Sequence, residues 1–106
     1  RLVRHASGAQ GIRIVRTEAA DLRDLAARSE PPQGDRVLLD APCSGLGVLS
    51  KRADLRWNRR PEDLDELVAL QDALLAAAAK LVRPGGLLVY STCTFAPEEN
   101  DCVLCI

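Results

Sequence analysis

The sequence is poor in aromatic residues, has no long apolar run and carries no excess of either charge. Trp57, Tyr90 and Phe95 are the only aromatics among its 106 residues, so Leu, Ala and Val dominate the apolar content. No segment approaches the roughly 18 apolar residues that span a bilayer, and the basic start lacks the apolar core of a signal peptide. We therefore expect no membrane partner, and one small domain or a piece of one.

The sequence also has a single histidine and a net charge close to zero. His5 is the single histidine, with no cysteine or acid at ligand spacing, and we expect an ordinary surface residue. A net charge of −1 argues neither for nor against a nucleic-acid partner. Two of the four cysteines directly follow predicted strands and do not lie in loops that disulfides would cross-link, which favours reduced thiols. We expect an intracellular, reducing compartment, with the cytoplasm favoured over the nucleolus or a plastid.

Apolar periodicity predicts strands that alternate with helices. The most regular segment is residues 61–83, which has one apolar face, acids in its first turn and Pro-Gly-Gly after its end. The other predicted elements are a strand at 11–16, a short helical or irregular turn at 23–28, strands at 36–39 and 87–90, and a helix that begins at 97. This order predicts a doubly wound α/β fold, in which the long helix leads to a parallel neighbouring strand.

Two of the predicted strands end in a cysteine motif. Asp-Ala-Pro-Cys-Ser-Gly-Leu-Gly occupies 40–47, and Ser-Thr-Cys-Thr occupies 91–94. The carboxyl ends of parallel strands meet at the ligand-binding edge of a sheet, so Cys43 and Cys93 are expected to face one pocket. A thiol there can have a lowered pKa and act as a nucleophile, with Asp40 moving a proton. The alternative is that both cysteines are packed as small apolar residues.

A metal or dinucleotide site fits the motifs less well. Cys102 and Cys105 form a C-x-x-C pair, but Cys43 and Cys93 lack such partners, so a zinc module is disfavoured and no metal is expected. A thioredoxin-like use of the pair is disfavoured too, because the pair does not open a helix after a strand. The glycines at 45–47 lack the third glycine of a dinucleotide fingerprint.

Residues 47–60 are rich in cations. Lys51, Arg52 and Arg56 belong to this patch, which contains a single acid. A solvated loop and a phosphate-contacting loop are equally compatible with the pattern. Trp57, within the patch, is more typical of a packing residue than of a base-stacking one.

The two cysteine motifs, Arg-Pro-Gly-Gly-Leu-Leu-Val-Tyr at 83–90 and Pro-Glu-Glu-Asn at 97–100 resemble the Sun (Fmu) family of RNA cytosine-5 methyltransferases. The resemblance runs from about 11 to 100. It implies that residues 1–106 are part of a Rossmann-like class I methyltransferase catalytic domain. The family's glycine-rich cofactor loop and its C-terminal strands are expected to lie outside these residues. We accordingly expect the chain alone to bind S-adenosylmethionine weakly or not at all.

The resemblance also implies a reaction, the transfer of a methyl group from S-adenosylmethionine to C5 of a cytosine in rRNA or tRNA. Cys93 would be the nucleophile that adds to C6, and Cys43 the second thiol that assists the later elimination. The residues alone leave this choice open, because DNA cytosine-5 methyltransferases use the cysteine of a Pro-Cys motif as nucleophile.

The remaining roles follow from the same resemblance. Asp40 would contact the cytosine N3/N4 edge or the cofactor. Asp21 matches the acid that contacts the cofactor's adenosine, although a helix cap is its local alternative. Lys51, Arg52 and Arg56 would help to hold an RNA whose target base is unstacked. The rival hypothesis is a non-catalytic RNA-binding remnant of the family.

Overall fold

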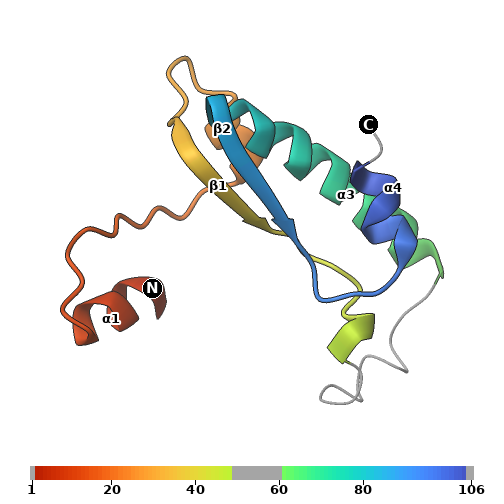
Figure 1. Cartoon of the computed structure of the whole chain (residues 1–106). Coiled ribbons are helices and arrows are strands. Elements are labelled where there is room, and N and C mark those ends of the chain that lie inside the picture. Colours follow the sequence, from red (N-terminus) through yellow and green to blue (C-terminus); the bar gives the residue numbers. More distant parts are fainter. Residues whose placement is uncertain (1, 49–60, 105–106) are drawn as a thin grey trace.

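The computed structural model describes residues 2–48 and 61–104. Two parallel strands form its centre, and a long helix lies beside them (Figure 1). The elements in chain order are α1 (Leu2–Ala9), α2 (Leu22–Ala26), β1 (Gly34–Asp40), the 3-10 turn η1 (Leu46–Val48), α3 (Pro61–Lys80), β2 (Val82–Ser91), the 3-10 turn η3 (Pro97–Glu99) and α4 (Asp101–Leu104). The chain is thus α/β, as predicted.

The sheet register places both cysteine motifs at one edge. β1 and β2 pair in parallel, with Leu38 opposite Val89 and Asp40 opposite Ser91. Because α3 returns the chain to the start of the sheet, both strands end at the same side (Figure 1). The predicted crossover is therefore confirmed.

The Pro-Gly-Gly segment lies inside β2 and not between the helix and the strand. The helix ends at Lys80, three residues earlier than predicted, and Gln33 Nε2 donates to the Lys80 carbonyl over 2.8 Å. Pairing with β1 begins at Val82, opposite Gly34. An irregularity in the ladder between Val82 and Leu87 then accommodates Pro84. Gly85 has a φ of 80°, a conformation that glycine adopts readily. The strand boundary differs from the prediction because a bulge tolerates residues that a regular strand excludes.

The core lies between the sheet and one face of α3. It is formed by the buried residues Leu39, Ala41, Leu75, Ala78 and Val103. The predicted apolar face of the long helix supplies two of them, which confirms its periodicity. No helix in the described ranges is long and apolar enough to cross a membrane.

The N-terminal part of the fold differs from the prediction. Residues 11–16 form no strand, and the side chain of Ile14 is 94% exposed. An alternating pattern produces a strand only where a neighbouring edge supplies backbone partners, and the described sheet contains β1 and β2 alone. The helix α1 was not predicted. At the other end, the helix expected from residue 97 is divided into η3 and the short α4.

Candidate active site

The two predicted cysteines lie against each other. The Sγ atoms of Cys43 and Cys93 are 2.8 Å apart, and the Cys93 backbone N–H donates to Cys43 Sγ over 3.2 Å. Both cysteines are free thiols. Cys43 is half-buried and Cys93 is exposed, so they are not a pair of buried packing residues. The exposed Cys93 thiol, with Cys43 beside it, can react with a small electrophile.

Backbone contacts hold the two cysteine segments together beyond the strands. The Ala41 N–H donates to the Ser91 carbonyl over 2.8 Å, and the Gly47 N–H donates to the Cys93 carbonyl over 3.0 Å. A Cβ at Gly47 would lie 2.8 Å from that same carbonyl oxygen, closer than real contacts allow. The glycine at 47 therefore permits the approach that places η1 against Cys93.

The pKa of Cys93 is raised rather than lowered, contrary to our expectation. The main cause is its hydrogen bond with Cys43, followed by burial, and the nearby negative charge of Asp40 contributes in the same direction. At neutral pH, Cys93 therefore retains its proton, and nucleophilic attack requires a group that removes it. Asp40 stands at the exposed end of β1, close enough for its charge to act on the thiol.

Asp21 adopts its local alternative, a helix cap. It precedes α2, and its carboxylate accepts hydrogen bonds from the Arg23 backbone N–H over 2.8 Å and from the Arg23 guanidinium. The guanidinium is the main cause that lowers the pKa of Asp21 to about 2, so the side chain is ionised at neutral pH. A contact between Asp21 and a cofactor remains a prediction. The cations Lys51, Arg52 and Arg56 lie outside the described residues.

A buried polar cluster behind the cysteines was not predicted. Glu99, Gln71 and Ser44 are 0%, 0% and 5% exposed. The Glu99 carboxylate accepts hydrogen bonds from the Ser44 backbone N–H over 2.7 Å, from the Ser44 hydroxyl, and from Gln71 Nε2 over 2.9 Å. Burial opposes ionisation of Glu99, but the hydrogen bonds, led by those from Ser44, outweigh burial and lower its pKa.

One sequence signal for this cluster was available. Gln71 falls on the apolar face of α3, four residues from both Leu67 and Leu75, where a polar side chain needs a buried partner. Glu99 gave no comparable signal, because an acid after Pro97 is also what the positive end of a helix favours.

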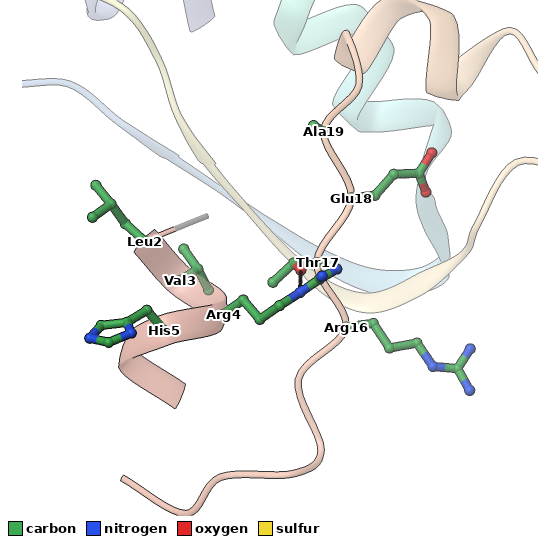
Figure 2. A pocket seen from close by; sticks show the side chains of 8 residues that line it. All are labelled: Leu2, Val3, Arg4, His5, Arg16, Thr17, Glu18 and Ala19. Atoms are coloured by element: carbon green, nitrogen blue, oxygen red, sulfur yellow. Dashed lines mark hydrogen bonds between the residues drawn. The ribbon is translucent and has the colours of Figure 1, made fainter. Parts of the chain in front are cut away.

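A separate hollow lies in the N-terminal part. It has a volume of about 990 Å³ and lies between α1 and residues 16–19 (Figure 2). The Arg4 side chain reaches across it, and its Nε donates to Thr17 Oγ1 over 3.3 Å. His5 lines the hollow and is exposed, as expected of a surface residue. The hollow contains none of the residues of the cysteine site. Among the described residues, no group of three or more His, Cys, Asp or Glu is placed to hold a metal.

Comparison with known proteins identifies the family. The family model for 16S rRNA methyltransferase RsmB/F matches residues 3–105. The chain belongs to the RsmB/F family. A probable ribosomal RNA small subunit methyltransferase B of Bacillus subtilis is 40% identical over 104 residues, covering 98% of this chain and 23% of the relative. Its counterpart in Synechocystis is 46% identical over 91 residues, covering 86% of this chain and 20% of the relative.

Solved structures agree with this assignment. The crystal structure of PH0851 superposes with a TM-score of 0.89 and 38% identity, over 96% of this chain and 23% of that one. NSun6 from Pyrococcus horikoshii, solved with the S-adenosylmethionine analogue SFG, gives a TM-score of 0.81 and 36% identity, over 95% of this chain and 25% of that one. The Sun-family resemblance and the Rossmann-like fold are thus confirmed. The RsmB/F chain spans about a quarter or less of the length of these proteins.

Proposed function

We propose that this RsmB/F chain is part of the catalytic domain of an S-adenosylmethionine-dependent enzyme that methylates C5 of a cytosine in 16S rRNA. The observation that carries the proposal is the pair of thiols, 2.8 Å apart, beyond the ends of two parallel strands. The family supplies the wider context of rRNA methylation. The choice of C5 of cytosine follows from the resemblance to the Sun family, and two adjacent thiols suit the chemistry that this reaction requires.

C5 of cytosine is too weak a nucleophile to take a methyl group unaided. In the proposed reaction, the Asp40 carboxylate accepts the proton of the Cys93 thiol, and the sulfur then forms a bond to C6. The electron pair of the C5–C6 double bond shifts to C5 and makes that carbon nucleophilic. After methylation, Cys43 acts as the base that removes the C5 proton, and the electron pair of the broken C5–H bond restores the C5–C6 double bond. The S–C6 bond breaks at the same time, and its electron pair leaves on Cys93 as the thiolate. The exposure of Cys93 suits attack on a base that enters from outside.

Cys43 and Asp40 fit supporting roles in this scheme. Cys43 touches Cys93, so it is placed to assist the elimination that frees the methylated base. Asp40 is exposed at the end of β1, where its carboxylate can accept a hydrogen bond from the cytosine N4 amino group. That contact, or proton exchange through N3, would favour addition at C6.

The residues present are compatible with S-adenosylmethionine. When bound, this cofactor would supply the methyl group as an electrophile. The exposed Asp40 carboxylate lies at the sheet edge where α/β folds bind ligands, and the ionised Asp21 can accept a hydrogen bond from the cofactor's adenosine. Of these two acids, Asp21 also caps α2, so cofactor contact would add to an existing structural role.

The substrate must present an unstacked cytosine, because a base within a helix does not expose C6 to a thiol. Lys51, Arg52 and Arg56 are proposed to contact RNA phosphates beside the site. The test is incubation of the purified full-length enzyme that contains this chain with a 16S rRNA transcript and S-adenosylmethionine carrying an isotopically labelled methyl group, followed by mass spectrometry of the nucleosides. We expect label in 5-methylcytidine. Label on N4 of cytosine or on another base would contradict the proposal.

A further inference from the structure

Glu99 is a buried carboxylate that binds polar groups of two separate segments of the chain. Its side chain has no exposed surface, and a buried carboxylate is costly unless hydrogen bonds compensate the lost hydration. The compensating donors come from two segments that are distant in sequence, Ser44 beyond β1 and Gln71 in the middle of α3. A charged group in such a position ties these segments together more strongly than an apolar contact would.

The hydrogen bonds flank Cys43 on both sides. Glu99 binds the backbone and the hydroxyl of Ser44, which follows the cysteine. Gln71 Nε2 donates to Glu99 and also, over 2.9 Å, to the carbonyl of Pro42, which precedes the cysteine. These two acceptors fix the orientation of the Gln71 amide, because its oxygen in that place would face two other oxygens. The backbone on either side of Cys43 is therefore held by one connected network.

Asn100 holds Cys93 in the same way. Its Nδ2 donates to the carbonyls of Thr94, over 3.2 Å, and Ala96, over 3.0 Å. Its Oδ1 accepts from the Thr92 hydroxyl over 2.7 Å. Thr92 and Thr94 are the neighbours of Cys93 in sequence, so this thiol too is flanked on both sides.

The two networks meet where the cysteine segments meet. The hydroxyls of Ser44 and Thr94 lie 3.0 Å apart, and the Tyr90 hydroxyl donates to the backbone carbonyl of Glu99 over 2.9 Å. Glu99 thus holds the Cys43 segment and, through a hydrogen bond from the Thr94 side chain, also contacts the Cys93 segment, whereas the Asn100 side chain holds the Cys93 segment alone.

We propose that Glu99 and Asn100 are positioning residues that set the separation of the two thiols. The catalytic consequence rests on the function proposed above, whereas the effect on thiol geometry does not. Loss of Glu99 should displace Cys43, and loss of Asn100 should displace Cys93. Neither residue needs to touch the RNA or the cofactor.

The chain offers matched substitutions. Glu99→Gln keeps the side-chain length, so its amide oxygen can accept from Ser44 and Gln71 while its amide nitrogen donates to the Ser44 hydroxyl. Glu99→Ala removes every acceptor. Asn100→Asp keeps the acceptor for Thr92 but replaces both amide donor hydrogens with an oxygen that faces two carbonyls. Glu98→Ala changes an exposed neighbouring acid and serves as the control.

The first test measures thiol geometry without RNA or cofactor. Dibromobimane becomes strongly fluorescent when it bridges two nearby thiols, and it would be applied to protein in which Cys102 and Cys105 are serine. We expect the wild type, Glu98→Ala and Glu99→Gln to be bridged at similar rates, and Glu99→Ala and Asn100→Asp to be bridged roughly tenfold more slowly. Circular dichroism and thermal unfolding establish that each variant is folded.

An unchanged bridging rate in folded Glu99→Ala would overturn the proposal. If Glu99→Ala does not fold, Ser44→Ala replaces it as the test, because it deletes the hydroxyl that donates to the same carboxylate and contacts Thr94, and keeps the backbone hydrogen bond. We then expect bridging to slow by roughly twofold to threefold, and an unchanged rate overturns the proposal in the same way.

The second test separates the two residues by the step that each affects. In the full-length enzyme that contains this chain, with unmodified cytosine RNA and S-adenosylmethionine, Glu99→Ala should accumulate covalent protein–RNA adduct, as expected when the releasing thiol is displaced. Asn100→Asp should instead form adduct more slowly. Equal effects of both variants on both steps would overturn the division of tasks. If Cys93→Ala still forms adduct, the proposed role of Cys93 as nucleophile fails, while the bridging result stands by itself.

Discussion

The sulfur of Cys43 lies 2.8 Å from the sulfur of Cys93, although 50 positions separate the two residues in sequence. The parallel register of β1 and β2 brings their segments to one edge of the sheet. The contact between Gly47 and the Cys93 carbonyl, together with the Glu99 and Asn100 hydrogen bonds, then closes the remaining gap. The proximity is therefore a property of the whole fold.

This proximity predicts that replacement of Cys43 activates Cys93 toward alkylation. The hydrogen bond with Cys43 is the main cause that raises the pKa of Cys93, so Cys43→Ala should lower that pKa. At pH 8, a larger fraction of Cys93 would then be thiolate, the reactive form. Iodoacetamide labelling followed by peptide mass spectrometry measures the rate at Cys93, with Cys102 as the internal reference. Slower labelling of Cys93 in the variant would be inconsistent with this explanation.

The buried carboxylate predicts a specific acid sensitivity. Because the pKa of Glu99 in the folded protein lies below its ordinary value of 4.5, its stabilising effect is fully present above that pH and is lost as pH falls through the folded pKa. Glu99→Gln has no such titration. Urea unfolding between pH 7 and pH 3 should therefore show a difference between wild type and variant that shrinks below about pH 4.5. A difference independent of pH would argue against an ionised Glu99.

Gly47 predicts a steric effect on the site. In Gly47→Ala, the new methyl group would meet the Cys93 carbonyl oxygen at 2.8 Å, so one of the two backbone segments must move. Methyl transfer should fall by roughly tenfold to a hundredfold, since small displacements of reacting groups have effects of that size. Gly8→Ala is the matched control, because a Cβ there has no atom within 4 Å. Equal activity of the two variants would show that the contact with Cys93 is unimportant.

The sequence predicted the elements that carry strong periodic or positional signals. The long helix, the two strands and the convergence of Cys43 and Cys93 follow from apolar periodicity and from the rule that parallel strands end together. The strand at residues 11–16 failed because a strand depends on a partner edge that local sequence does not specify. The raised pKa of Cys93 depends on an atomic contact with Cys43, which no spacing rule contains.

The partners of buried polar residues likewise cannot be predicted from the sequence alone. Gln71 on an apolar helix face indicated that some polar partner must exist, but its identity requires the tertiary fold. In the sequence alone, Glu99 and Asn100 are typical of the solvated first turn of a helix. In three dimensions they hold the neighbours of the two cysteines. Positioning residues of this kind become visible only when the hydrogen bonds are known.

Covalent trapping on RNA that contains 5-fluorocytosine tests most directly whether Cys93 is the nucleophile, because the C5 fluorine prevents the final elimination. The full-length enzyme that contains this chain would be prepared as wild type, Cys43→Ala and Cys93→Ala. Each would be incubated with this RNA and S-adenosylmethionine, and adducts separated by denaturing electrophoresis. We predict a stable adduct with the wild type and with Cys43→Ala, and none with Cys93→Ala. An adduct with Cys93→Ala and none with Cys43→Ala would contradict the account and assign the nucleophile to Cys43.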